Sequence, residues 1–264
     1  MTAYMDHKDL SNRTIDDARA RQIADGVHSV QEQIAQAEAV AGRPAGSVHL
    51  LAATKTRDVG EIMAAIDAGI RLIGENRPQE VEAKADGLHE ECAARGIDIA
   101  GGLGDGAHLG FHLIGQLQAN KINKVLGVVD TIESVDSLKL AQRIATRAAA
   151  RGITAGVLLE VNESGEESKS GCEPAEAAEL AAQIADLDGV RLDGLMTIGA
   201  HVDDEAVIRR GFAHLRGLRD ELQSSIPTCT QLSMGMTHDL AYAVAEGSTI
   251  VRVGTAIFGL RAFI

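Results

Sequence analysis

Residues 48–56 read VHLLAATKT, an apolar run that ends in a lysine between two threonines. An alanine-rich amphipathic segment follows at 59–68, and a second apolar run, RLIG, lies at 71–74. Both runs are nearly continuous in apolar residues, which is typical of parallel strands buried on both faces. The stretch therefore predicts a strand–helix–strand unit whose lysine stands at the end of the first strand.

The same alternation repeats to the end of the chain. Strands are predicted at 48–53, 71–74, 111–114, 128–132, 156–161, 190–197, 229–233 and 249–253. Helices are predicted between them, near 59–68, 78–95, 117–126, 135–151, 174–187, 204–224 and 238–246. Eight strands alternating with helices in roughly 210 residues match an α/β fold of the (β/α)₈ TIM-barrel type. An open doubly wound sheet is the alternative, but eight parallel strands would be many for this length.

The remaining segments lie outside this repeat. Residues 1–13 are polar and are predicted to form a flexible N-terminal tail, so that 14–264 form one barrel domain. An extra N-terminal helix is predicted to begin at Thr14-x-x-Asp17, which resembles a capping box, and to end by Gly42. Residues 97–110 (IDIAGGLGDGAHLG) are rich in glycine and are predicted to form a surface loop.

Charge and composition exclude several classes of function. With 25 basic and 38 acidic residues the 264-residue chain carries a net charge of −13, and only 2% of it is aromatic. Nucleic-acid binding needs a positive surface and, for single strands, stacking aromatics, so we expect no nucleic-acid partner. The apolar runs are strand-sized, far short of the ~20 residues of a membrane helix, and the first residues are not of signal-peptide type. We therefore expect a cytoplasmic protein without a membrane partner.

Cysteine and histidine spacing predicts neither disulfides nor a metal. Cys92, Cys172 and Cys229 are odd in number and form no CxxC motif, so free buried thiols are expected. His108 and His112 are four residues apart, but Gly110 between them and the predicted strand argue against a helical metal site.

The polar residues that follow the predicted strands form one constellation. Lys55 ends an apolar strand, and desolvation lowers the pKa of a lysine and makes it a Schiff-base nucleophile. The buried Arg252 needs an anionic or acceptor partner, and an ion pair with a barrel glutamate such as Glu75 or Glu160 is its structural alternative. The loops after the last two strands offer hydroxyls and glycines suited to a phosphate, namely Ser233, Gly235, Gly254 and Thr255. A lysine, a phosphate-binding loop and an arginine together match the aldehyde, the phosphate and the ring nitrogen of pyridoxal 5′-phosphate (PLP). Taken singly, a solvated loop lysine and local turn hydroxyls are the plainer interpretations.

Several strings in the chain also resemble a known family. They are AATKTRD around Lys55, IGENRPQE at 73–80, FHLIGQLQANK at 111–121, VNESGEESKSG at 161–171, GLMTIG at 194–199, LSMGMTHDL at 232–240 and STIVRVGTAIFG at 248–259. The chain resembles the YggS/PROSC family of pyridoxal-phosphate-binding, or PLP homeostasis, proteins. It departs from the family pattern at Gly110, where a tryptophan is usual, and at Thr237, where the family more often has serine.

The resemblance implies a barrel like the N-terminal domain of alanine racemase, with PLP bound covalently as an imine on Lys55. It implies a phosphate near Ser233, Gly254 and Thr255, Arg252 near the pyridine nitrogen, and a site lined further by Asn76, Met234 and Gly235. It implies no catalytic residues, because the family role is to hold PLP reversibly, to limit the free aldehyde and to deliver PLP to PLP-dependent apoenzymes. We expect a monomer.

Two enzyme classes are the alternatives. An amino-acid racemase of the same barrel type would add a second, β-rich domain, and this chain ends about eleven residues after the last predicted strand. A Schiff-base aldolase would carry its lysine on a later strand than Lys55 does.

Overall fold

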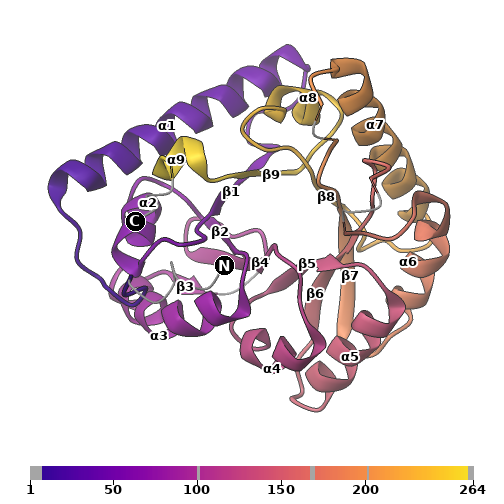
Figure 1. Ribbon diagram of the computed structural model, residues 1–264, viewed down its shortest axis with the longest axis horizontal. Coiled ribbons are helices and arrows are strands. Elements are labelled where there is room, and N and C mark those ends of the chain that lie inside the picture. Colours follow the sequence, from indigo (N-terminus) through magenta and orange to yellow (C-terminus); the bar gives the residue numbers. More distant parts are fainter. Residues whose placement is uncertain (1–7, 100–101, 167–169, 201, 261–264) are drawn as a thin grey trace.

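The computed structural model describes residues 8–99, 102–166, 170–200 and 202–260. Figure 1 shows that the chain forms a ring of parallel strands surrounded by helices. Eight of the nine strands in these ranges form the ring, in which β1 pairs with both β2 and β9, and β2 pairs with β4 to close it. The barrel strands are β1 (His49–Ala53), β2 (Leu72–Glu75), β4 (His108–Leu113), β5 (Thr131–Val135), β6 (Ala155–Glu160), β7 (Val190–Met196), β8 (Gln231–Ser233) and β9 (Ile250–Val253). The predicted (β/α)₈ barrel is confirmed.

Helices cover the outside of the barrel. In chain order they are α1 (Asp17–Val40), α2 (Val59–Asp67), α3 (Pro78–Ala94), α4 (Ile122–Val125), α5 (Leu138–Ala149), α6 (Ala177–Ala185), α7 (Glu205–Leu222), α8 (Leu240–Ala245) and α9 (Thr255–Phe258). Short 3₁₀ turns at Ala119–Lys121 and Pro174–Glu176 precede α4 and α6. None of the helices in the described ranges is long and apolar enough to span a membrane.

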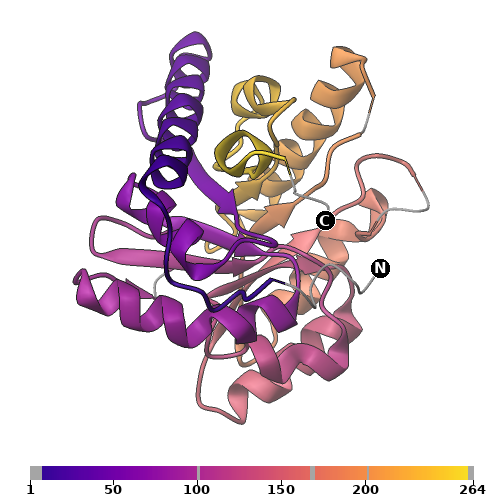
Figure 2. The same ribbon diagram turned by 60° about the vertical axis from the view of Figure 1, so that its left-hand side comes forward.

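The predicted extra N-terminal helix is present as α1. It buries Ile23, Val27, Val30 and Ile34, which recur at helical spacing, and packs against α2, α8 and α9. Figure 2 shows it lying along the outside of the barrel next to the C-terminal helices. Its N-cap is Asp16, whose side chain accepts a hydrogen bond from the backbone N–H of Arg19. The helix therefore starts two residues after the predicted cap Thr14, because the carboxylate of Asp16 accepts from one of the first unpaired amides.

The described part of the predicted flexible tail, residues 8–13, packs against α2. Leu10 is buried, and the carbonyls of Leu10 and Asn12 accept hydrogen bonds from the backbone of Val59 and Gly60. The Lys8 ammonium lies 2.6 Å from Glu61 Oε2. The polar pattern of residues 8–13 thus hides one buried leucine and backbone pairing. Residues 1–7 lie outside the described ranges, and the flexible tail stays a prediction.

The glycine-rich segment predicted as a surface loop instead folds across the amino-terminal end of the barrel. It contains a short strand, β3 (Asp98–Ile99), which pairs with the start of β4. A Cβ on Gly104 would lie 1.9 Å from the carbonyl oxygen of Arg71, and one on Gly110 would lie 2.1 Å from that of Gly102. Glycine is required at both positions because the backbones approach so closely. The side chain of Leu103 packs there against the interior of the barrel.

Two other predicted boundaries are shifted. The strand predicted at 128–132 runs from 131 to 135, because the chain still turns through Gly127, whose φ is +84°, and Val129 bridges back to Leu126. The helix predicted at 117–126 is reduced to a 3₁₀ turn followed by α4. The shift places Glu133 within β5.

Candidate functional site

The predicted site residues lie on four neighbouring strands at one end of the barrel. Lys55 follows β1 and Asn76 follows β2, whereas Ser233 ends β8 and Arg252 lies in β9. These strands pair in the order β8–β9–β1–β2. Since all are parallel, their carboxyl ends meet at the same mouth, which is where barrels carry function.

A buried ion cluster supports the turn that carries Lys55. The Lys84 ammonium is fully buried and donates to Glu75 Oε1 at 2.5 Å, to Glu80 Oε2 at 3.2 Å and to the carbonyl of Thr54 at 3.1 Å. The backbone N–H of Thr56 donates to the same Glu80 oxygen at 2.6 Å. The two residues that flank Lys55 are therefore tied to α3 and β2.

Thr56 itself has a φ of +66°, the only positive value of a non-glycine residue in the described ranges. Such a conformation costs roughly 1–3 kcal/mol and persists where surrounding contacts enforce it, often at functional sites. The hydrogen bond from its amide to Glu80 is one such contact. The strained turn fixes the direction in which the half-buried Lys55 leaves the strand.

Three buried polar atoms around Lys55 have no hydrogen-bond partner among the described residues. They are Thr56 Oγ1, Glu75 Oε2 and Asn76 Oδ1. Burial, only partly offset by Lys84, raises the pKa of Glu75 to about 7. Orphaned buried polar groups are rare in native proteins, so their gathering beside one lysine points to a polar ligand at this place.

The loops after β8 and β9 form a cradle of backbone amides. No described residue accepts a hydrogen bond from the N–H groups of Gly235, Gly254 or Thr255. Gly235 has a φ of +96°, and a Cβ there would lie 2.4 Å from that of Ala243. Gly254 lies beside the end of β1, where a Cβ would be 3.2 Å from the carbonyl oxygen of Ala53. Free amides next to Lys55 suit an anion such as a phosphate.

Hydroxyl groups differ in their access to this cradle. Thr255 is exposed and Thr237 is half-buried, and neither hydroxyl is engaged with a described residue. Ser233 is fully buried, and its hydroxyl already donates to Glu133 Oε2 at 2.6 Å. Met234 is fully buried as well, and its backbone N–H donates to the carbonyl of Ile250. The two residues anchor the end of β8 below the cradle.

The anionic partner of Arg252 is a glutamate that the sequence patterns did not single out. Arg252 Nη1 lies 2.5 Å from Ser233 Oγ and 3.8 Å from Glu133 Oε2, and its Nη2 donates to the carbonyl of Thr197 at 2.8 Å. The structure thus pairs Arg252 with a barrel glutamate, as the structural alternative expected, but the two examples given for it, Glu75 and Glu160, are wrong. Glu75 is bonded to Lys84, and burial raises the pKa of Glu160 to about 7.

Glu133 and Thr237 were missed for different reasons. Glu133 fell just outside the predicted strand, and only its alternation with Thr131 in the true strand would have placed it inside the barrel. Thr237 was noted only as a departure from a family string. The carbonyl at Thr197, which helps to hold Arg252, carries no side-chain signal at all.

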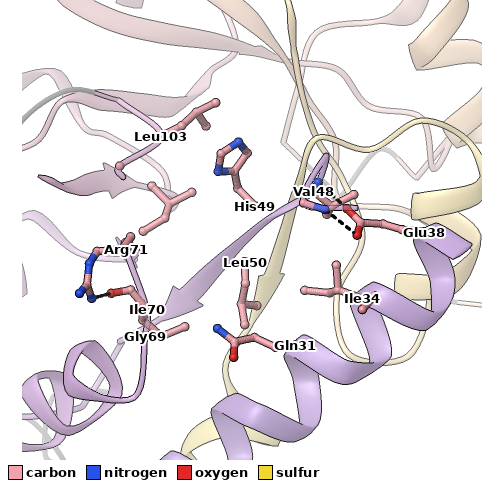
Figure 3. A pocket seen from close by; sticks show the side chains of 14 residues that line it. Gln31, Ile34, Glu38, Val48, His49, Leu50, Gly69, Ile70, Arg71 and Leu103 are labelled. Carbon is pink, nitrogen blue, oxygen red and sulfur yellow. Dashed lines mark hydrogen bonds between the residues drawn. The ribbon is translucent and has the colours of Figure 1, made fainter. Parts of the chain in front are cut away.

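A separate cavity of about 300 Å³ opens at the opposite end of the barrel, between α1 and the starts of β1 and β2. Figure 3 shows the His49 ring in it, with Glu38 bonded to the backbone of Val48 and Arg71 to that of Ile70. The two charged groups are thus engaged by the backbone, and the mouth with Lys55 is the better candidate for a functional site.

Comparison with known proteins agrees with this geometry. The sequence profile "Alanine racemase, N-terminal domain" matches residues 27–262. The pyridoxal phosphate homeostasis protein of Aquifex aeolicus is 39% identical over 235 residues, which cover 89% of this chain and 96% of that protein. The chain therefore belongs to the alanine racemase N-terminal domain family and, within it, to the pyridoxal phosphate homeostasis proteins, so the resemblance predicted from sequence is confirmed.

Two solved structures are similar over nearly the whole chain. The crystal structure of an unknown protein from Bifidobacterium adolescentis has a TM-score of 0.92 at 68% identity and covers 95% of this chain and 100% of its own. PipY of Synechococcus elongatus, solved with PLP bound, has a TM-score of 0.71 at 34% identity and covers 90% of this chain and 100% of its own.

Proposed function

We propose that this protein binds PLP reversibly and covalently through Lys55 and acts in PLP homeostasis. The observation that carries the proposal is the pairing of two features at one mouth: a lysine beside three orphaned polar atoms, and a cradle of unpaired amides next to it. The names of the curated relatives and the PLP-bound state of PipY support it.

The residues present fit this cofactor. When bound, PLP would supply an aldehyde carbon to which the Lys55 amine adds reversibly. The amides of Gly235, Gly254 and Thr255 would hold its phosphate through charge-assisted hydrogen bonds. Arg252 would face the pyridine nitrogen, and Asn76 would line the site with its orphaned Oδ1.

We assign the phosphate hydroxyls to Thr255 and Thr237 ahead of Ser233. The Ser233 hydroxyl has one proton, and that proton is directed at Glu133. To bind phosphate it would have to give up a buried charge-assisted hydrogen bond. Its role is therefore to hold Arg252 under the site, with Met234 and Gly235 shaping the loop above it.

The proposed role is that of a carrier. A guanidinium can only donate a hydrogen bond, so Arg252 would leave the pyridine nitrogen unprotonated and the ring a weak electron sink, which disfavours enzymatic chemistry at the bound amino group. Reversible attachment limits the free aldehyde and permits transfer to PLP-dependent apoenzymes. We further propose that the chain acts as a monomer in the cytoplasm; the three free, buried cysteines are in keeping with a reducing compartment.

The direct test is attachment of PLP. Wild type mixed with PLP should become yellow, and borohydride reduction followed by peptide mapping should place the pyridoxyl group on Lys55. Lys55→Ala should form no reducible adduct, while Lys124→Ala, which removes a surface amine paired with Glu82, should behave as wild type. A pyridoxyl group found on Lys84 or Lys121, or on Lys169, which lies outside the described residues, would overturn the assignment. For the role, a deletion strain should show altered vitamin B6 vitamers and amino acids.

A further inference from the structure

A chain of buried hydrogen bonds crosses the inside of the barrel and ends on Arg252. The carbonyl of Gly102 lies 2.8 Å from His112 Nε2, and His112 Nδ1 lies 2.7 Å from Glu133 Oε1. The second oxygen of Glu133 accepts from Ser233 at 2.6 Å, and Ser233 accepts from Arg252 at 2.5 Å. The three side chains of the middle are fully buried. The chain joins the segment at the bottom of the barrel to the mouth.

The direction of every hydrogen bond in this chain follows from donor chemistry. Arginine can only donate, so Ser233 accepts from Arg252 and must give its own proton to Glu133. A carbonyl can only accept, so His112 donates to Gly102 through Nε2. An ionised Glu133 accepts at its other oxygen, so His112 donates through Nδ1 as well. Both ring nitrogens then carry protons, and the chain is a buried imidazolium–carboxylate–guanidinium array.

Electrostatics agrees with these protonation states. Burial alone would lower the pKa of His112, but its hydrogen bond to Glu133, the charge of that carboxylate and its bond to the Gly102 carbonyl together raise the pKa above its ordinary value. Burial alone would raise the pKa of Glu133, but His112 and Arg252 hold it below its ordinary value. The carboxylate is thus shared by two cations, one on each side.

We infer that His112 and Glu133 are positioning residues that set the orientation of the Arg252 guanidinium toward the cofactor ring. The inference rests on the proposed function. Arg252 is held by Ser233 on one side and by the carbonyl of Thr197 on the other, so the plane of its fork is fixed by two contacts. Without the hydrogen bond from His112, the Glu133 carboxylate would have Ser233 and Arg252 as its remaining partners. Both side chains would then be drawn toward Glu133.

Fold stability alone does not call for this array. Buried ion pairs are often no more stabilising than apolar side chains of similar volume. The same barrel also holds an apolar cluster, formed by Leu51, Leu72 and Ile250 with Leu103. A charged array that ends on Arg252 at the mouth therefore indicates a role toward the group that the mouth binds.

The test compares two histidines inside the same barrel. His112→Phe removes the donor to Glu133, and His112→Asn restores an N–H at the Nδ1 position. His49→Phe is the control, because His49 lies in another barrel strand, β1, and its ring has no hydrogen-bond partner among the described residues. Absorption spectra and PLP affinity are measured for each. In the ligand-free proteins, NMR of the Arg252 guanidinium reports its geometry without any cofactor.

We expect His112→Phe to shift the absorption band of bound PLP, to weaken PLP binding about tenfold (~1.4 kcal/mol) and to move the Arg252 guanidinium signals. His112→Asn and His49→Phe should stay within about twofold of wild type. Should His112→Phe fail to fold, Glu133→Gln, which keeps the shape of the side chain, is expected to give the same shifts. Unchanged Arg252 signals and an unchanged band in a folded variant overturn the inference. If wild type takes up no PLP, the proposed function fails. The NMR signals of the ligand-free proteins then decide by themselves whether His112 sets the orientation of Arg252.

Discussion

The ammonium of Lys84 lies 2.5 Å from Oε1 of Glu75, and both side chains are fully buried. The pair joins α3 to the end of β2, directly beside the turn that carries Lys55. The same ammonium reaches Glu80, so one cation serves two carboxylates. Removing it would leave buried negative charge at the base of the mouth.

We expect Lys84→Met to lower the free energy of unfolding by about 3–5 kcal/mol, because breaking a buried pair leaves an uncompensated charge. Urea unfolding at pH 7 measures this loss. Lys124→Met is the matched control: Lys124 pairs with Glu82 at the surface, and its loss should cost less than about 1 kcal/mol. Equal effects of the two substitutions would contradict the role of the buried cluster.

Acid should weaken a second cluster, centred on Glu61. Burial alone would raise the pKa of Glu61, but hydrogen bonds from Lys8 and Arg19 outweigh burial and hold it below its ordinary value. A carboxyl whose folded pKa is lowered stabilises the fold above its unfolded pKa of ~4.5, and this contribution is lost as the pH falls through the folded pKa.

We therefore expect Glu61→Gln to be less stable than wild type at neutral pH, and the difference to shrink as the pH falls below about 4. Chemical unfolding at a series of pH values measures it. Glu90→Gln, which removes the exposed partner of Arg13, should differ from wild type by no more than about 0.5 kcal/mol at any pH. A difference for Glu61→Gln that grew in acid would reverse the sign and refute the prediction.

Retention of PLP should depend on the threonine hydroxyls of the cradle. Each charge-assisted hydrogen bond is worth roughly 1.5–3 kcal/mol, so Thr237→Val with Thr255→Val should weaken PLP binding at least about 100-fold. Dialysis followed by absorbance measures retention. Thr228→Val, whose hydroxyl bonds to the carbonyl of Leu192 away from the mouth, is the control. Equal affinity of wild type for pyridoxal and PLP would show that no phosphate is recognised.

Ser233→Ala should have a different effect from the threonine pair. Its hydroxyl links Arg252 to Glu133, so its loss should shift the spectrum of bound PLP while most of the PLP is retained. Arg252→Gln should behave in the same way. Absorbance before and after dialysis distinguishes a shifted spectrum with PLP retained from a loss of PLP. Loss of colour from Ser233→Ala alone would instead make Ser233 a phosphate ligand.

Racemase turnover should be far below ordinary enzyme rates of about 1–10³ s⁻¹. Efficient racemisation needs two positioned acid/base groups, one on each face of the bound substrate. Lys55 can act as one of these groups, and we propose no residue for the other. A coupled assay for D-alanine from L-alanine measures it, with an alanine racemase run in parallel. Turnover within the ordinary range would make the protein an enzyme.

The sequence by itself determined the barrel and singled out Lys55 as the candidate cofactor lysine. Apolar runs such as 48–53 can be recognised because buried parallel strands exclude polar residues on both faces. The end of such a run places Lys55 at the mouth of the barrel. Likewise, α1 is visible from Ile23 to Ile34 because helical periodicity is a local property.

Only the tertiary structure decided the partners of the buried charges. Arg252 and Glu133 are 119 positions apart, yet they lie 3.8 Å apart because closure of the barrel brings β5 and β9 to face one interior. Lys84, a lysine on a helix, has the sequence signature of a solvated side chain and is fully buried. Local patterns report which face of an element is apolar, whereas the pairing of charges depends on strand register and on the geometry of closure, which no local stretch encodes.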